Sequence, residues 1–235
     1  MDLLLEGVVG SQAYGLATPD SDTDYAGIYV EPTSSLLGLH PPSRERATIK
    51  GRGGADATYH EVGKALHLGL SCNPTAMELL WLADYLHFDP FGEELIGLRH
   101  CLLSAPRVRD AFLGYATSQF RRLLERGKFP DVPDKRREKH ARHTMRLLHQ
   151  GLTLYTTGVL PIRVEDPDRY FDFGRAIMAD PHASAAQTLI RDYGRRFDEA
   201  TTVLPDQPDE APLEDLLQRI RRAHLDREPE LQHAS

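Results

Sequence analysis

An α+β fold is predicted for this chain of 235 residues: a small mixed β-sheet with its helices, followed by a helical C-terminal half. Apolar runs of strand length occur only within about the first 60 residues. From about residue 61 onward, apolar residues recur instead at the three- and four-residue spacing of helices. These patterns favour two domains, residues 1–105 and residues 106–235.

The strand signals come first along the chain. Residues 3–9 form an apolar run that ends at Gly10, as a buried strand does. A second run, residues 26–30, ends before a loop rich in Pro, Ser and Gly. Residues 46–50 and 55–59 are predicted to pair as a hairpin.

The helical signals follow. Val62, Leu66 and Leu70 recur at four-residue spacing and predict the first helix. Asn73-Pro74 predicts the start of the next helix, because proline is well tolerated at the first helical position. Ser184 is predicted to cap a later helix. Further helices are predicted at residues 76–85, 108–126, 135–157, 184–202 and 213–225.

The composition excludes several classes of protein. The apolar start, LLLEGVV, has no basic flank and is interrupted by Glu6, so it predicts neither a signal peptide nor a membrane span. Cys72 and Cys101 are too few for a disulfide framework or a zinc site. We therefore expect a cytoplasmic protein with no membrane partner.

The charge is unevenly distributed. The net charge of −7 argues against a protein coated for nonspecific nucleic-acid binding. Residues 119–146, however, hold ten Lys or Arg against four acids, a local net charge of +6. The segment is either a solvated helical face or a surface for phosphates. Its basic residues are Arg121, Arg122, Arg126, Lys128, Lys135, Arg136, Arg137, Lys139, Arg142 and Arg146.

The most informative stretch is GSQAYGLATPDSDTDYAGIYV, residues 10–30. Gly10-Ser11 closes a strand, so its backbone N–H groups and the Ser11 hydroxyl could cradle phosphate oxygens. Asp22 and Asp24 are two apart in an extended segment, which predicts that both carboxylates point to one side. Two carboxylates suit magnesium when phosphates and water supply its other ligands. Asp56, on the presumed neighbouring strand, is the candidate third carboxylate of a two-metal site.

These aspartates also have simpler interpretations. Asp20, Asp22, Asp24 and Glu31 fall at positions 1, 3, 5 and 12 of an EF-hand calcium loop. Tyr25, however, occupies the position where that loop requires glycine, and strand-like flanks replace its helices. The second alternative for these aspartates is a plain Asp-rich turn. The corresponding alternative for Asp56 is an ordinary acidic residue at the edge of a strand.

The Gly-Ser pair, the ten-residue spacer and the Asp-x-Asp strand resemble the signature of the DNA polymerase beta-like nucleotidyltransferases. The stretch from Gly10 to Val30 resembles the bacterial RNA repair pathway branch of that superfamily in particular. Three further stretches carry the resemblance to about residue 174. They are Asp56, NPTAMELLW from Asn73, and KHARHTMRLLHQGLTLYTTGVLPIRV from Lys139.

The resemblance implies an enzyme that moves a nucleoside monophosphate from an NTP, such as ATP, to a hydroxyl acceptor and releases pyrophosphate. It implies two Mg²⁺ ions, or Mn²⁺ in their place. Gly10 and Ser11 would bind phosphate, and Asp22 and Asp24 would bind both metals. Asp56 would bind the catalytic metal and help to deprotonate the acceptor. Residues 1–105 would be the catalytic domain, with residues 106–235 closing over the nucleotide.

A basic stripe is predicted on the helix at residues 135–157. Lys139, His143 and Arg146 recur at i, i+4 and i+7 and share a face. That face is either a clamp for the β- and γ-phosphates, to which Arg163 would add, or a solvated face. Met145, Leu148 and Leu152 are expected to point to the core instead. The outer basic residues are expected to bind RNA; they are Arg121, Arg122, Arg136 and Arg137.

The sequence does not specify the acceptor hydroxyl. An RNA end is favoured mildly by the basic segment, but relatives also modify small molecules and protein hydroxyls. A non-catalytic nucleotide- or RNA-binding module is the remaining alternative. The preferred base and the oligomeric state are not predicted.

Overall fold

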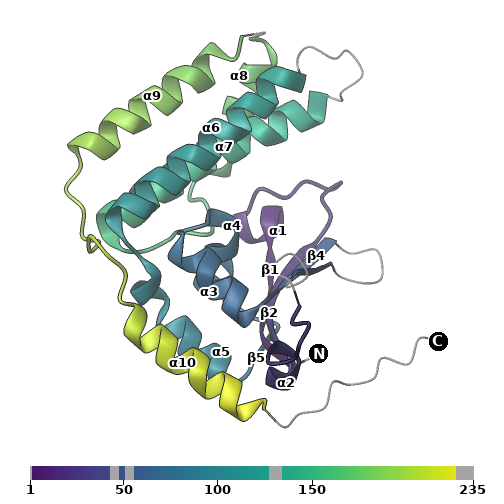
Figure 1. Ribbon diagram of the computed structural model, residues 1–235. Helices are drawn as coiled ribbons and strands as arrows, with labels where there is room; N and C mark the ends of the chain where they lie inside the picture. The colour runs from purple at the N-terminus through teal and green to yellow at the C-terminus, as the bar shows by residue number, and fades with distance from the viewer. Residues whose placement is uncertain (1, 43–47, 51–55, 127–133, 181, 226–235) are drawn as a thin grey trace. The chain divides into compact units, whose positions relative to one another are not determined.

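The computed structural model describes residues 2–42, 48–50, 56–126, 134–180 and 182–225 (Figure 1). The chain forms two compact units, which are described separately. The sheet unit comprises Met1–Leu70, Thr75–Leu102 and Pro208–Ser235. The helical unit comprises Ser71–Pro74 and Leu103–Gln207. The fold is α+β, with the sheet in the N-terminal part and long helices after it, as predicted.

The described strands form one mixed sheet of five strands in the order β3-β4-β2-β1-β5. Strand β1 is antiparallel to β2 and β5, β2 is parallel to β4, and β3 is antiparallel to β4. The predicted pairing of residues 46–50 with 55–59 is confirmed for residues 48–50; the intervening residues 51–55 lie outside the described residues. The strands are β1 (Asp2–Val9), β2 (Asp24–Val30), β3 (Thr48–Lys50), β4 (Asp56–Glu61) and β5 (His87–Phe88).

Short helices surround this sheet. Leu4, Leu5, Ile28, Tyr29 and Val62 are buried in its core. The helices of the sheet unit are α1 (Gly10–Tyr14), α2 (Thr33–Leu36), α3 (Val62–Leu70), η1 (Glu78–Trp81, a 3-10 helix), α5 (Pro90–Gly97), η2 (Arg99–Leu102, also 3-10) and α10 (Glu210–Ala223). Helix α4 (Pro74–Met77) begins at the last residue of the helical unit's first segment and continues into the sheet unit.

The predicted helix at residues 76–85 was too long. It begins at Pro74, as the Asn-Pro signal indicated, but tightens into η1 and ends at Trp81, after which Leu82 is extended. All four residues of η1 are buried, so this segment packs on every side and has no single apolar stripe.

The described residues of the helical unit form four long helices. Figure 1 shows α6 and α7 side by side along their length. A Cβ at Gly151 of α7 would lie 2.5 Å from the Phe112 Cβ of α6, so the glycine permits this close approach. The helices are α6 (Ala105–Arg126), α7 (Asp134–Thr157), α8 (Pro167–Met178) and α9 (Ser184–Glu199).

Two details differ from the expectations for this unit. Helix α8 was not predicted, although Asp166 caps it by accepting a hydrogen bond from the Arg169 N–H and Pro167 opens it. Ser184 was predicted as the cap of α9, but it is the first helical residue and Ala183 precedes it in the left-handed conformation. The Asp180 carboxylate instead accepts the N–H groups of His182 and Ser184, at 2.9 and 2.5 Å.

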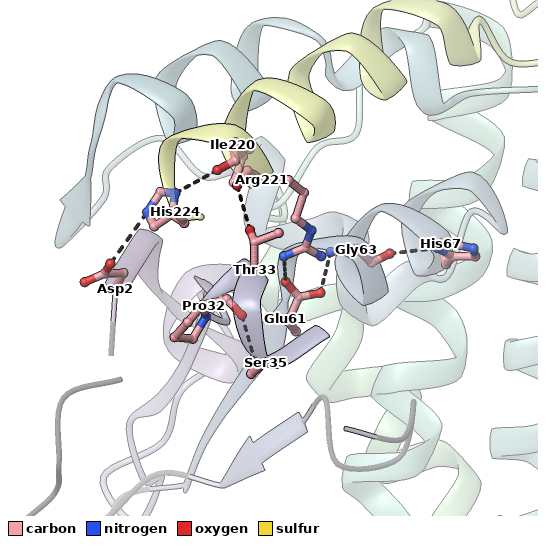
Figure 2. Close-up of polar contacts among 10 residues, drawn as sticks. All are labelled: Asp2, Pro32, Thr33, Ser35, Glu61, Gly63, His67, Ile220, Arg221 and His224. Atoms are coloured by element: carbon pink, nitrogen blue, oxygen red, sulfur yellow. Dashed lines mark hydrogen bonds and ion pairs between the residues drawn. The ribbon is translucent and has the colours of Figure 1, made fainter. Parts of the chain in front are cut away.

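Helix α10 belongs to the sheet unit, whereas the expected boundary assigned residues 106–235 to one helical domain. Its residues Leu213, Leu216 and Ile220 are buried, and Figure 1 shows it beside α5. Figure 2 shows how its C-terminal end is held: Arg221 Nη1 donates to Glu61 Oε1 at 2.5 Å, and Thr33 Oγ1 donates to the Arg221 carbonyl at 2.7 Å. Amphipathic periodicity predicted the helix but could not indicate which core it covers.

Replacing Arg221 by Ala is expected to lower the free energy of unfolding by about 3 kcal/mol, because it leaves the Glu61 carboxylate buried without its guanidinium partner. Glu61 is only 5% exposed. The matched control is Arg219→Ala, two residues earlier on α10, whose partner Glu94 is partly exposed. That exposed pair is expected to contribute less than about 1 kcal/mol. Equal losses for the two variants in chemical unfolding would contradict the role of the Glu61–Arg221 pair.

None of the described helices combines the length and the apolarity needed to cross a bilayer. Cys72 and Cys101 are both free thiols.

Candidate functional site

Three strands bring the predicted site residues to one edge of the sheet. Val9, the last residue of β1, pairs with Asp24, the first residue of β2. Asp24 in turn is the register partner of Asp56, the first residue of the parallel strand β4. Register partners on neighbouring strands project their side chains to the same face, with backbones about 4.8 Å apart. Asp24 therefore lies at the centre of this edge, between the end of β1 and the start of β4.

Gly10 lies directly against Asp24. Its φ of +69° is in the left-handed region that favours glycine, and a Cβ at this position would lie 2.2 Å from Asp24 Oδ2. No side chain larger than hydrogen fits there while the carboxylate keeps its position. The Gly-Ser turn and the aspartate strand, separated by more than ten residues in sequence, are thus in contact through this glycine.

Ser11 follows Gly10 in the short helix α1 and is half-buried. The helix closes with the N–H of Gly15 donating to the Gln12 carbonyl and the N–H of Leu16 donating to the Ser11 carbonyl at 2.9 Å. This closure fixes the backbone of Ser11 at the rim of the same sheet edge.

Asp22 and Asp24 were expected on one extended strand, but only Asp24 belongs to β2. Asp22 precedes β2 in an irregular segment and is exposed, and Asp56 is also exposed. Among the described residues, no three His, Cys, Asp or Glu side chains are gathered closely enough to hold a metal ion. Asp24 and Asp56 are nevertheless at one register on one face, and two carboxylates suit magnesium when phosphate and water supply its other ligands.

The predicted basic stripe of α7 is not uniformly exposed. Lys139 is exposed and His143 is half-buried, whereas Arg146 is only 3% exposed. Arg146 Nη1 donates to Gln150 Oε1 at 2.5 Å, and Gln150 Nε2 donates to the Pro161 carbonyl at 2.7 Å. Arg146 therefore belongs to the interior of the helical unit and does not lie on a solvated face. Met145, Leu148 and Leu152 are buried, as expected.

His143 is neutral in this arrangement. Arg146 Nη2 lies 3.0 Å from His143 Nδ1, and because a guanidinium only donates, Nδ1 must be the acceptor and the ring proton must be on Nε2. Burial lowers the pKa of His143 well below its usual range, and the charge of Arg146 lowers it further. The pKa of His149, also on α7, is lowered by burial and by Arg169.

The lowered pKa of His143 predicts a pH dependence of stability. The unfolded chain binds a proton at His143 near pH 6.5, whereas the folded chain does not, so stability is complete above that pH and is lost as the pH falls below it. Between pH 7 and pH 5 this group should remove about 2 kcal/mol from the free energy of unfolding.

His143→Gln, which keeps a hydrogen-bond acceptor for Arg146, is expected to flatten the dependence by that amount. Chemical unfolding at a series of pH values measures it. His67→Gln, a change at an exposed ring, is the control. If both variants keep the wild-type slope, His143 is not held neutral.

The rest of the basic segment is only partly available to a ligand. Arg121 and Arg122 are exposed, and Arg137 is half-buried. Arg142 pairs with Glu138 and lies over the Phe171 ring at 4.6 Å. Arg126, Lys128, Lys135 and Arg136 lie outside the residues whose side chains are described.

Comparison with known proteins gives one result. Residues 1–179 match the family model described as the RNA repair pathway DNA polymerase beta family. The matched stretch contains the complete sheet edge and extends through α8, while α9 and α10 follow it. A search of curated proteins found no match.

Proposed function

Because the chain belongs to the RNA repair pathway DNA polymerase beta family, we propose that it transfers a nucleoside monophosphate from an NTP to a hydroxyl at an RNA end. One observation carries the proposal: Gly10 contacts the Asp24 carboxylate, and Asp24 is the register partner of Asp56 on the parallel strand. A phosphate-binding turn and two carboxylates thereby meet at one edge of the sheet.

The carboxylates would hold magnesium or manganese in two positions. Asp24 and Asp56 are the central pair, and exposed Asp22 is the third candidate ligand. When bound, the metal would polarise the phosphate and make the attacking hydroxyl more acidic.

Other residues of the chain would bind the triphosphate and accept the proton of the acceptor hydroxyl. The Ser11 hydroxyl and the N–H groups of the turn would hold the triphosphate. Asp56, exposed at the start of β4, would take the proton of the acceptor hydroxyl. The acceptor oxygen would form a bond to the α-phosphorus while the bond to the bridging oxygen breaks and pyrophosphate leaves. Within the helical unit, Lys139 is the exposed member of the basic stripe, and buried Arg146 holds His143 through its contact with Nδ1.

The test uses NTPs labelled at the α-phosphate. The protein is incubated with magnesium, each NTP in turn, and RNA that ends in a free 3′-hydroxyl. Label is expected to move to the RNA, and to be lost when the RNA end is blocked with phosphate or when magnesium is chelated. NTP labelled at the γ-phosphate should transfer nothing, since pyrophosphate is released. Transfer of γ-label, or no transfer of α-label under any condition, would overturn the proposal.

A protein or small-molecule hydroxyl is the second candidate acceptor. Arg142 and Arg146 are engaged within the helical unit, which reduces the basic surface that an RNA could use. Label appearing on protein or on a small acceptor, with RNA having no effect, would favour this candidate.

Removing Arg121 and Arg122 together is expected to weaken RNA binding and to flatten its salt dependence. Each lost phosphate contact should reduce the slope of log affinity against log salt by somewhat less than about one unit. Filter binding at several salt concentrations measures it. Arg175→Ala, an exposed arginine of α8, is the control and should bind RNA as the wild type does. An unchanged slope for the double variant would exclude these two arginines from the RNA contact.

A further inference from the structure

A buried carboxylate lies behind the phosphate-binding turn. Glu78 is 4% exposed and stands within η1 among Met77, Leu79 and Leu80, which are also buried. Burying a carboxylate is costly unless hydrogen bonds compensate, so an apolar residue would be the less costly choice for packing alone. The Glu78 carboxylate, in the sequence MELLW, is therefore expected to accept a hydrogen bond from a specific donor.

One such partner is Tyr14. Its hydroxyl donates a hydrogen bond to Glu78 Oε2, and the tyrosine is itself only 8% exposed. Tyr14 is the last residue of α1, the helix that begins with Gly10 and Ser11. Ser11 and Tyr14 are three residues apart, so one helical turn connects the buried anchor to the half-buried serine.

The hydrogen bonds of Gly15 and Leu16 close the turn, and Tyr14 ties it to a separate segment of the chain. Helix α1 has five residues and no side-chain cap, and isolated helices of that length are unstable. The anchor at Tyr14 is therefore suited to hold the whole turn as a rigid body, including the Ser11 hydroxyl at the sheet edge.

We propose that Glu78, acting through Tyr14, is a positioning residue that sets the Ser11 hydroxyl and the N–H groups of the Gly-Ser turn for the triphosphate of the NTP. The inference rests on the proposed nucleotidyl transfer and adds a residue from a separate part of the chain to its site. Neither Glu78 nor Tyr14 is proposed to touch the reacting atoms.

The decisive variant is Tyr14→Phe, which removes one oxygen and keeps the ring. It is expected to raise KM for NTP by about tenfold, with kcat changed by less than about threefold, since the turn contributes binding to the unreacted triphosphate. Glu78→Gln retains an oxygen that accepts from Tyr14 and should stay near wild type, whereas Glu78→Ala should match Tyr14→Phe. Combining Tyr14→Phe with Ser11→Ala should cost less than the sum of the two single losses, because the Ser11 hydroxyl is one of the groups that Tyr14 positions.

Tyr59→Phe is the matched control. Tyr59 also donates to a glutamate, Glu6, within the sheet unit, so this variant removes the same kind of bond at another place. Its KM should equal that of the wild type. Hydrogen exchange gives a readout independent of activity: the Gly15 and Leu16 amides, bonded to the Gln12 and Ser11 carbonyls, should exchange faster in Tyr14→Phe and not in Tyr59→Phe.

The outcomes separate the two claims. If the wild type transfers nucleotide and Tyr14→Phe has the KM and the amide exchange of Tyr59→Phe, the positioning role is overturned while the proposed function stands. Additive losses in the double variant with Ser11→Ala also overturn it, since they indicate a general structural role. If the wild type transfers no nucleotide from any NTP, the proposed function fails, and the positioning role fails with it.

Discussion

Asp24→Asn is expected to lower kcat/KM for the proposed nucleotidyl transfer by at least about a thousandfold, because a carboxylate in the proposed metal-binding role contributes several kcal/mol of charge stabilisation in the transition state. Asparagine keeps the shape of the side chain that Gly10 contacts but removes its negative charge. The fold should survive. Neighbouring carboxylates repel in the absence of a cation, so the free energy of unfolding of the metal-free protein should be equal to or above that of the wild type.

The control for this variant lies in the segment between α1 and β2. Asp20→Asn changes an exposed acid four residues earlier and should leave transfer within about twofold of the wild type, as is usual for a surface position. Transfer by Asp24→Asn within tenfold of the wild type would remove Asp24 from the catalytic site. Loss of activity together with loss of the folded state, measured by thermal unfolding, would contradict the expectation that the role is chemical.

Gly10→Ala is expected to have the second large effect, on both activity and stability. The new methyl group would lie 2.2 Å from Asp24 Oδ2, so either the turn or the carboxylate must move. The positive φ of +69° adds about 1–2 kcal/mol of strain for any residue with a Cβ. Together these costs should lower the free energy of unfolding by about 2–4 kcal/mol, and the displaced turn should lower kcat/KM by about a hundredfold or more.

Gly158→Ala separates strain from displacement. Gly158 has a φ of +75°, and a Cβ there would meet only the Val203 side chain at an ordinary distance of 3.5 Å. Gly158→Ala introduces the same backbone strain without a steric clash. It should therefore lower the free energy of unfolding by about 1–2 kcal/mol and leave the activity unchanged. Chemical unfolding and transfer assays on both variants make the comparison. Equal behaviour of the two would show that Gly10 is needed for its conformation alone and not for the contact with Asp24.

Local patterns were sufficient for much of the fold. The apolar run before Gly10 and the run after Asp24 predicted β1 and β2, and helical spacing predicted α3, α6, α7, α9 and α10. These signals are local because hydrophobic periodicity follows directly from the geometry of each element. Helices α5 and α8 were missed although each begins with Asp-Pro; Asp89 accepts the Gly92 N–H at 2.7 Å as a cap.

The candidate site was predicted as a set of residue types and not as an arrangement. The Gly-Ser pair, Asp24 and the family resemblance follow from the sequence alone, and residues 1–179 match that family. The contact between Gly10 and Asp24, and the register of Asp24 with Asp56, depend on hydrogen bonds between strands far apart in the chain. No local propensity specifies such a register, because each strand has the same backbone groups at every residue.

The surroundings of each helical face were likewise decided only by tertiary structure. Periodicity placed Lys139, His143 and Arg146 on one face of α7, but it could not show that this face passes from solvent at Lys139 to the interior at Arg146. It predicted α10 as a helix but not its position on the sheet unit, where Arg221 meets Glu61. The sequence by itself determined which residues share a strand, a turn or a helical face. Only the tertiary structure decided what each of those faces meets, because that depends on packing between segments distant in the chain.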